Sequence, residues 1–242
     1  MSVHLCLAPH VRACAHGGQV ILLDLRKGRY LGVAGTRFAP LGSAVSGWPR
    51  PDHIPPGAPT PTSGALDALA APLLRQGLLT RSPSPLHAQA NAALPEAART
   101  LNAEELVGTA PVDAACLVRF VRCSAAAGLR LRLLPLQHIA HRITMRRTQT
   151  ASTTQVPASH DRLRIAVAAY LHLRPLLLTA HDRCLQDSLS LLGFLAAEGW
   201  RPHWVIGVTT QPLRAHAWVQ AGDLVLSDLH ENVRRYTPIL VA

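Results

Sequence analysis

Three residues of this sequence could together make a thiol nucleophile: Cys184, His216 and Asp228. Cys184 opens a stretch whose leucines recur at helical spacing, and the unpaired N–H groups at a helix N-terminus lower the pKa of a thiol placed there. A nucleophilic cysteine also needs a base within hydrogen-bonding reach and a third group that orients the base. The sequence therefore offers Cys184 as the nucleophile, with Asp182 as a candidate cap of its helix.

The base and its orienting carboxylate are found in a predicted β-hairpin near the end of the chain. If the hairpin turn has three residues, Gln220 pairs with Leu224, and His216 then stands directly opposite Asp228. Directly opposed side chains point to the same face of the ladder, close enough for the carboxylate to accept the imidazole N–H. With a two-residue turn the register slips by one, and the two side chains fall on opposite faces. In the three-residue register, Trp218 shares the face of His216 and would shield the pair from water.

Each of these residues also has a structural interpretation. A lone cysteine at a helix start is more often structural than catalytic, and a histidine at the start of a strand is usually a surface residue. His181, Cys184 and His216 could hold a metal, but they lack a convincing fourth ligand. Asp187, one helical turn beyond the thiol, and Asp223, in the hairpin turn, are weaker orienting groups. The order of cysteine, histidine and aspartate, each at the end of an element, favours the catalytic interpretation.

Composition and charge narrow the class of protein. The 242 residues are 48% hydrophobic, which supports a folded core, and the formal net charge is +10. Lys27 is the only lysine, so nearly all of the positive charge is arginine, which suits bidentate contact with carboxylate or phosphate. An acidic partner could be nucleic acid, a membrane surface or an acidic peptide. The arginine-rich stretch 130–147 has no interleaved aromatics, so we interpret it as a solvated helix face and expect no nucleic-acid partner.

Targeting signals and cysteine usage indicate the compartment. Met1 is not followed by a charged segment and a long apolar one, and no stretch has the roughly 18 uninterrupted apolar residues of a membrane span. The five cysteines are odd in number and irregularly spaced, without a Cys-x-x-Cys pair. This spacing is typical of reduced thiols rather than of a disulfide framework or a cysteine-rich zinc site. We expect a soluble cytoplasmic protein with no membrane partner, no metal and no other cofactor.

The elements predicted from periodicity divide the chain into two domains of an α+β protein. We expect a first domain at 1–82, a linker rich in alanine, proline and serine at 83–112, and a second domain at 113–242. The first domain is predicted to contain strands at 20–25 and 29–33 joined by Lys27-Gly28, a third strand within 3–14, loosely helical residues 35–48, and a helix that begins near Ala65 and ends at Gly77. The second is predicted to contain helices at 113–127, 161–172 and 184–197, a polar loop at 145–159, and strands at 202–210, 216–220 and 224–228, with Gly128 and Gly199 as helix stops.

Linked motifs around the thiol resemble the lasso-peptide maturation proteases, the transglutaminase-like B proteins of lasso biosynthesis. The pattern is a Cys-Leu pair, a Ser-Leu pair, a Gly-Val strand, Ala-His-Ala-Trp-Val, and an Asp after a short apolar run. In this sequence the motifs stand at 184–185, 188–189, 207–208, 215–219 and 228, and the resemblance is strong from 173 to 242 and weak from 113 onward. Two positions depart from the pattern: Leu213 replaces a Phe, and Ser227 replaces an Asn.

The resemblance implies a papain/transglutaminase-like fold for the second domain. It also implies roles for three residues: Cys184 as nucleophile, His216 as general base and then acid, and Asp228 as the orienting group. The implied activity is removal of the leader peptide from a lasso precursor by a cysteine protease, before a separate ATP-using lasso cyclase acts. The precursor and the cyclase are therefore the expected partners. An acyltransferase or transglutaminase with the same triad and a non-catalytic peptide-binding protein remain alternatives.

The first domain resembles the precursor-peptide recognition element of the same pathways, a winged-helix-like unit similar to the small protein of pyrroloquinoline quinone biosynthesis. The matching stretches are LLDLRKGRYLGV and LLRQGLL. In that family the leader peptide adds as a strand to a sheet edge beside the last helix, where main-chain bonds give affinity and side-chain pockets give selectivity. Carried over, the resemblance implies a receiving strand and a helix wall, formed by Tyr30, Leu31 and Gly32 and by Leu69, Leu73 and Arg75. Core positions are the more common role for leucines at the spacing of Leu69 and Leu73.

Overall fold

The computed structural model describes residues 4–34, 40–49, 63–82, 94–101, 110–151, 160–177 and 183–242. The chain forms two compact units. One comprises Met1–Ala92 with Val208–Ala215 and Thr237–Ile239, and the other comprises Ala93–Gly207, His216–Tyr236 and Leu240–Ala242. Most of the predicted linker lies outside the described residues, which within it are 94–101 and 110–112.

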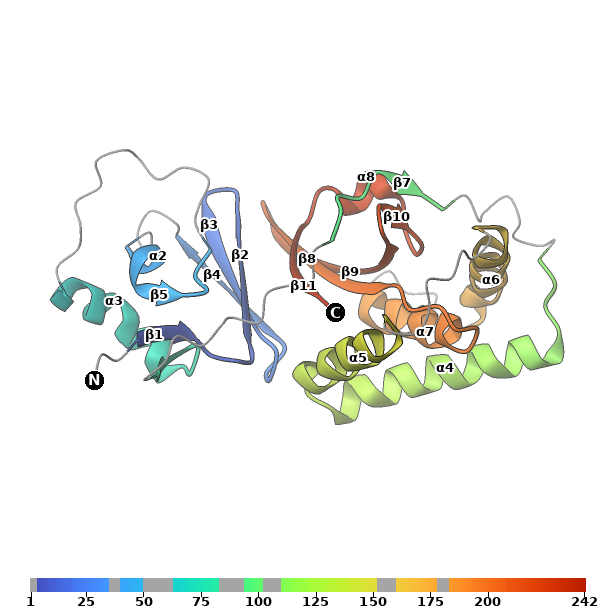
Figure 1. The fold of residues 1–242 in the computed structure, drawn as a ribbon, viewed down its shortest axis with the longest axis horizontal. Coiled ribbons are helices and arrows are strands. Elements are labelled where there is room, and N and C mark those ends of the chain that lie inside the picture. The colour runs from blue at the N-terminus through green and yellow to red at the C-terminus, as the bar shows by residue number, and fades with distance from the viewer. Residues whose placement is uncertain are drawn as a thin grey trace. The chain divides into compact units, whose positions relative to one another are not determined.

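A three-stranded antiparallel sheet dominates the N-terminal unit (Figure 1). Its strands are β2 (Val11–His16), β3 (Gln19–Asp24) and β4 (Arg29–Ala34), in the order β2-β3-β4. The predicted hairpin is confirmed, and Gly28 in its turn has a φ of 62°, a left-handed conformation that glycine adopts without a steric penalty. Asp24 holds the turn, because its Oδ1 accepts the N–H groups of Arg26 and Lys27 at 2.8 and 3.2 Å.

A second, smaller sheet has the order β5-β1-β6. Its strands are β1 (His4–Leu7), β5 (Val45–Ser46) and β6 (Leu79–Ser82). The predicted single strand within 3–14 is wrong, because the chain turns at residues 8–10 and places β1 and β2 in different sheets. The sequence analysis missed β6, which pairs antiparallel with β1 from the other end of the unit.

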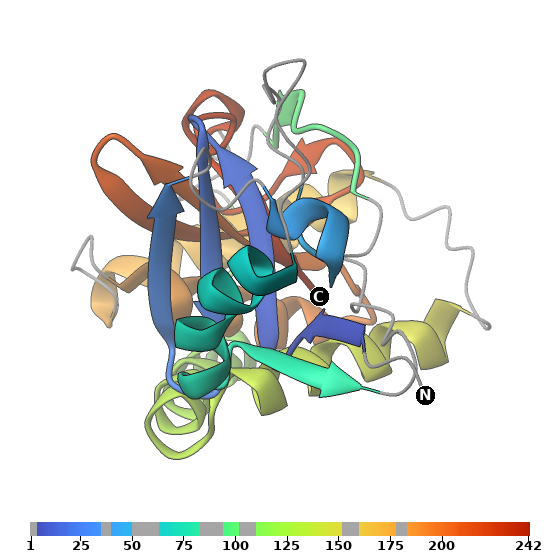
Figure 2. The same ribbon diagram turned by 90° about the vertical axis from the view of Figure 1, so that its left-hand side faces the viewer.

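Two helices, α2 (Leu41–Ala44) and α3 (Ser63–Arg75), share a core with the β2-β3-β4 sheet. Leu41 and Leu73 pack with Val20 and Leu22 of β3, and Figure 2 shows α3 lying across one face of the strands. The predicted helix stop is confirmed: Gly77 follows α3 with a φ of 73°. Of the predicted helical stretch 35–48, only α2 is helical among the described residues, and 35–39 lie outside them.

The second unit contributes most of the helices. They are α4 (Ala114–Leu133), α5 (Leu136–Ala151), α6 (His160–Leu173), the 3-10 turn η2 (Arg174–Leu176), α7 (Cys184–Ala196) and α8 (His230–Val233). The helices predicted at 161–172 and 184–197 are confirmed. Two predictions are wrong: α4 continues through Gly128, and α5 includes 145–151 of the predicted polar loop, whose residues 152–159 lie outside the described part. None of the described helices is long and apolar enough to cross a membrane.

A five-stranded sheet completes this unit, in the order β11-β8-β9-β10-β7. Its strands are β7 (Arg99–Thr100), β8 (His203–Thr210), β9 (Leu213–Ala221), β10 (Leu224–Val225) and β11 (Thr237–Val241). Phe120 of α4, Tyr170 of α6 and Phe194 of α7 meet edge to face, with ring centroids 5.5 and 5.6 Å apart. Val219 and Leu224 of the sheet join the same core, so α7 is packed between the other helices and the sheet (Figure 1).

Small residues let α4 and α7 approach closely, which explains why Gly128 lies inside a helix. A Cβ at Gly128 would stand 3.0 Å from the side-chain nitrogen of Gln186 on α7. Nearby, Ser124 and Ser190 share a hydrogen bond of 2.8 Å between their hydroxyls. The glycine therefore serves the contact between two helices, and this tertiary role outweighs its low helix propensity.

Candidate active site

Cys184 is the first residue of α7, and its side chain is half-buried. The N-cap is Arg183, whose side chain makes no capping hydrogen bond, and the predicted cap Asp182 lies outside the described residues. Ser188 fixes the first turn from the inside: its hydroxyl donates to the Cys184 carbonyl at 2.7 Å and accepts from Trp204 Nε1 at 2.9 Å. The thiol therefore occupies a helix start that a buried tryptophan of β8 holds in place.

His216 lies on β9, and its ring connects the thiol to a carboxylate. Its Nε2–H donates to Asp228 Oδ2 at 2.7 Å, and each of the two side chains is 24% exposed. Because the carboxylate engages Nε2, Nδ1 is the ring nitrogen left for Cys184, with which His216 also shares a hydrogen bond. The structure thus brings the three predicted residues into one hydrogen-bonded chain.

The hairpin that carries His216 and Asp228 differs from the predicted one. Leu224 pairs with Ala221, whereas the predicted three-residue turn would pair it with Gln220. The turn therefore has two residues, and the predicted register is wrong. In an unbroken ladder with the observed register, His216 and Asp228 would point to opposite faces.

A break in the ladder restores the contact. The N–H of Leu226 still donates to the carbonyl of Val219 at 2.9 Å, but the N–H of Val219 donates to Ser227 Oγ at 2.9 Å. A side-chain oxygen thus replaces the main-chain carbonyl that a continued strand would supply. Residues 226–228 bend out of the strand, and Asp228 reaches His216.

The thiol and the imidazole shift each other's pKa in opposite directions. Burial alone would raise the pKa of Cys184, but its hydrogen bond with His216 outweighs burial and lowers that pKa below its ordinary value. The main-chain N–H groups of Ala217 and Leu185 add to this lowering. Burial alone would lower the pKa of His216, yet Asp228 and Cys184 raise it to about 9. The site therefore favours a thiolate paired with an imidazolium at neutral pH.

Two aromatic rings enclose His216. Trp218 stacks on it with ring centroids 6.1 Å apart, as the sequence predicted, and Tyr236 lies 5.4 Å away. Gly207 on β8 makes room for both, because a Cβ there would stand 2.7 Å from the Trp218 ring and 2.8 Å from Tyr236 Cβ. Gln220 accepts the indole N–H of Trp218 at 2.9 Å. Tyr236 was not predicted, because no local pattern places it beside the hairpin.

Asp228 has two further hydrogen-bond donors. Its Oδ1 accepts the N–H of Leu229 at 2.7 Å and the amide of Asn232 on α8 at 3.1 Å. Burial alone would raise the pKa of Asp228, but the bonds from His216, Asn232 and Leu229 lower it. Asn232 was missed in the sequence, where its only signal is a spacing of four residues from Asp228. The carboxylate is therefore ionised and fixed in orientation.

Comparison with known families supports the nature of this part of the chain. A model of the transglutaminase-like superfamily matches residues 124–241, which include Cys184, His216 and Asp228. This region is a transglutaminase-like domain. No curated protein and no solved structure matches the chain. The prediction of a papain/transglutaminase-like second domain is therefore confirmed at the level of the superfamily.

Asp187 of the transglutaminase-like domain anchors α7 rather than orienting His216. Its Oδ1 accepts the hydroxyl of Tyr170 at 2.8 Å, and its Oδ2 pairs with Arg174 at 2.9 Å. Burial raises the pKa of Asp187, and the interactions with Arg174 and Tyr170 offset only part of this rise. These bonds connect the first turns of α7 to α6 and to the turn after it.

The remaining alternatives of the sequence analysis do not lead to His216. Asp223 makes a two-point contact with Arg99, at 2.8 and 2.9 Å. Among the described residues, no group of three or more His, Cys, Asp or Glu side chains could hold a metal ion. His181, the third member of the metal alternative with Cys184, lies outside the described part of the chain.

The six residues proposed to contact a leader peptide lie in the N-terminal unit. Tyr30, Leu31 and Gly32 are on β4, which among the described strands pairs with β3 alone and is thus an edge strand. On α3, Arg75 is exposed and Leu69 is half-buried. Leu73 is 2% exposed and belongs to the core, so its prediction as a surface contact is wrong.

Proposed function

We propose that this protein is a cysteine peptidase that removes the leader peptide from a lasso-peptide precursor. The observation that carries the proposal is the hydrogen-bonded chain from Cys184 at a helix start through His216 to Asp228, inside a transglutaminase-like domain. The superfamily match supports cysteine-based acyl chemistry. The lasso substrate is supported by the motifs of the sequence, from the Cys-Leu pair at 184–185 to Ala-His-Ala-Trp-Val at 215–219.

In the proposed first step, the Cys184 thiolate attacks the carbonyl carbon of the peptide bond between leader and core. The C–S bond forms, and the carbonyl oxygen takes up negative charge, for which the N–H of Cys184 at the start of α7 is a donor. The His216 imidazolium then gives its proton to the departing amine as the C–N bond breaks. The core peptide leaves with a free amine, and the leader stays on sulfur as a thioester.

In the second step, water replaces the amine. His216, now neutral, takes a proton from the water as the oxygen attacks the thioester carbonyl. The C–S bond breaks, and the leader departs with a free carboxylate while the thiolate–imidazolium pair is restored. Asp228 keeps the ring in one orientation through both steps and stabilises its charged form. The free amine of the core is the group that a separate ATP-using cyclase would consume.

We assign leader recognition to the N-terminal unit. The edge strand β4 offers unpaired main-chain groups to an added strand, and Arg75 at the end of α3 is exposed near the proposed wall. A unit that holds the leader raises the local concentration of the scissile bond at the thiol. The active site then needs little affinity of its own.

The decisive test uses the precursor peptide encoded beside this gene. Wild-type protein should yield two fragments by mass spectrometry, and Cys184→Ala should leave the precursor intact because no other group can form the thioester. Cys123→Ala, which changes a half-buried thiol of α4, is the matched control and should still cleave. Full cleavage by Cys184→Ala would end the proposal.

A second test concerns the leader alone. Arg75→Glu should weaken binding of a fluorescent leader peptide in anisotropy measurements and leave the alkylation rate of Cys184 unchanged, because it alters only the recognition surface. Arg26→Glu, in the exposed turn before β4, is the control. Equal binding by wild type and Arg75→Glu would remove Arg75 from the recognition surface.

The same residues could also serve an acyltransferase, since an amine can resolve the thioester instead of water. The mass of the leader fragment distinguishes the two: a free carboxylate marks hydrolysis, and an added amine marks transfer. A non-catalytic peptide-binding protein would need no activated thiol. Slow iodoacetamide labelling of Cys184 at neutral pH would favour that alternative over both enzymes.

A further inference from the structure

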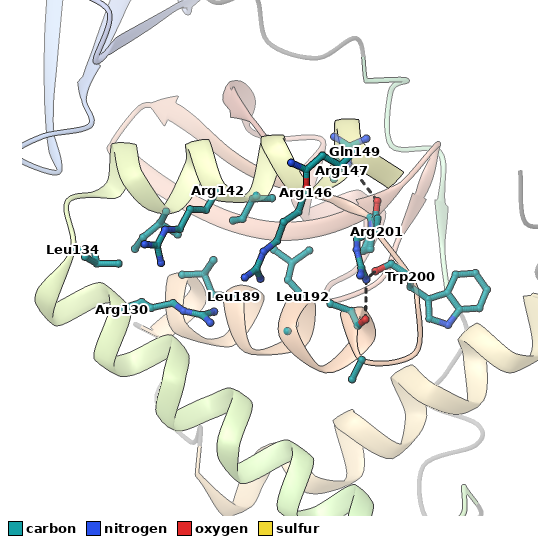
Figure 3. A pocket seen from close by; sticks show the side chains of 16 residues that line it. Arg130, Leu134, Arg142, Arg146, Arg147, Gln149, Leu189, Leu192, Trp200 and Arg201 are labelled. Atoms are coloured by element: carbon teal, nitrogen blue, oxygen red, sulfur yellow. Dashed lines mark hydrogen bonds between the residues drawn. The ribbon is translucent and has the colours of Figure 1, made fainter. Parts of the chain in front are cut away.

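A cavity of about 480 Å³ lies within the second unit, lined by α4, α5, α7 and the turn that follows α7 (Figure 3). None of Cys184, His216 and Asp228 lines it. The proposed reaction gives this cavity no role.

The floor and the inner walls of the cavity are apolar. Leu189 and Leu192 come from α7, Ile139 and Ile143 from α5, and Leu134 from the end of α4. Ile139 and Leu189 are buried, and the other three are half-buried. The cavity therefore offers apolar surface that a partner could cover.

Arginines line the rim. Arg130 from α4 and Arg142 and Arg146 from α5 point their guanidinium groups into the space above Leu189 and Leu192 (Figure 3). The side chains of Arg130 and Arg142 make no hydrogen bond or ion pair with the described part of the chain. Like charges gathered in this way repel one another unless an anion joins them.

The surrounding sequence supplies no such anion. From residue 114 to residue 160 the chain has seven arginines and no aspartate or glutamate. Two other arginines of the cavity already have partners: Arg147 donates to His203 Nε2 at 2.6 Å, and Arg201 donates to the carbonyls of Ala196 and Trp200 at 2.8 Å. The three rim arginines Arg130, Arg142 and Arg146 are thus the ones placed for an external carboxylate.

The backbone around the cavity argues against a phosphate buried on its floor. Phosphate sites commonly use main-chain N–H groups at helix N-termini. Here α7 contributes Leu189 and the residues after it, toward its C-terminal end, where helix carbonyls carry partial negative charge. An anion is favoured only at the arginine rim, and the floor suits apolar side chains.

We propose that this cavity is a docking site for an acidic amphipathic helix of a partner protein. The apolar face of that helix packs on Leu189, Leu192 and Ile143, and its flanking carboxylates pair with Arg130, Arg142 and Arg146, which is the helix-in-groove mode of recognition. The site is separate from the proposed peptidase chemistry and does not depend on it.

The test uses the full-length chain and a fluorescent 15-residue model peptide, with leucine at every third or fourth position and glutamate beside each leucine. Anisotropy should show saturable binding that weakens with added salt. Arg130→Glu/Arg142→Glu should weaken it at least about tenfold, because each change replaces an attraction with a repulsion. Arg132→Glu, an exposed residue of α4 outside the cavity, is the matched control and should change affinity less than about twofold.

Two further probes separate this proposal from general anion binding. The same peptide with glutamine in place of glutamate should bind poorly, and so should polyglutamate without leucine. Leu192→Gln, which alters the floor without touching the charges, should also weaken the model peptide. Equal loss in the Arg132→Glu control, tight binding of polyglutamate, or competition by a random DNA duplex at matched charge would each overturn the proposal.

Discussion

Asp228→Asn tests the cause of the unusual imidazole at the candidate site. The pKa of His216 is raised to about 9 from an ordinary 6.5, and the hydrogen bond to Asp228 is the largest of the interactions that raise it. Asparagine keeps the shape and can still accept the ring N–H, but it carries no charge. Because the Cys184 thiolate also raises this pKa, the substitution removes only part of the rise. We expect a fall of roughly one to two pH units, or about 1.4 to 2.7 kcal/mol of lost imidazolium stabilisation.

The assay is a pH titration of ¹³C-labelled histidine by NMR, with the His216 signal assigned by its absence in His216→Gln. A second readout is the rate at which iodoacetamide alkylates Cys184 at pH 7, followed by peptide mass spectrometry. This rate should fall about tenfold, because the thiolate loses part of its cationic partner. Cys123 has a raised pKa from burial and serves as the internal slow thiol.

The same bond links pH to folding stability. A histidine whose pKa is raised on folding stabilises the folded state fully below 6.5, and this contribution is lost as the pH rises through about 9. The difference in unfolding free energy between wild type and Asp228→Asn should therefore shrink from pH 6 to pH 10. Asp223→Asn, in the same hairpin but bound to Arg99, should leave the His216 titration unchanged. An unchanged His216 midpoint in folded Asp228→Asn protein would refute the assigned cause.

Two further substitutions test the packing around the site by urea denaturation. Gly207→Ala should destabilise the protein by about 1–3 kcal/mol, because the new Cβ would stand 2.7 Å from the Trp218 ring, and Gly64→Ala, where the Cβ meets open space, should not destabilise it. Tyr170→Phe should cost about 1.5–3 kcal/mol, because the buried carboxylate of Asp187 loses a hydrogen bond of 2.8 Å. Native stability in either variant would contradict the packing described here.

Local signals explain which elements could be predicted from the sequence. The β3–β4 hairpin followed from two apolar runs around Lys27-Gly28, and α7 followed from its leucine spacing, because each depends on residues close in the chain. The strands β6, β7 and β11 were missed, since each is short and is held by a partner far away in sequence. Gly128 misled for a related reason, because its role is a contact with Gln186 on another helix.

The site itself was predicted from residue types and motif order, whereas the geometry that joins it was not. The predicted contact between His216 and Asp228 relied on a three-residue turn, and the turn has two residues. The contact forms because Ser227 offers its hydroxyl to the N–H of Val219 and so ends the ladder one residue before Asp228. The family pattern has asparagine at this position, and serine and asparagine share a side-chain oxygen that can accept an N–H. The position therefore requires an acceptor that replaces a strand carbonyl, a requirement that no hydrophobic periodicity encodes, and Ser227 meets it despite its departure from the motif.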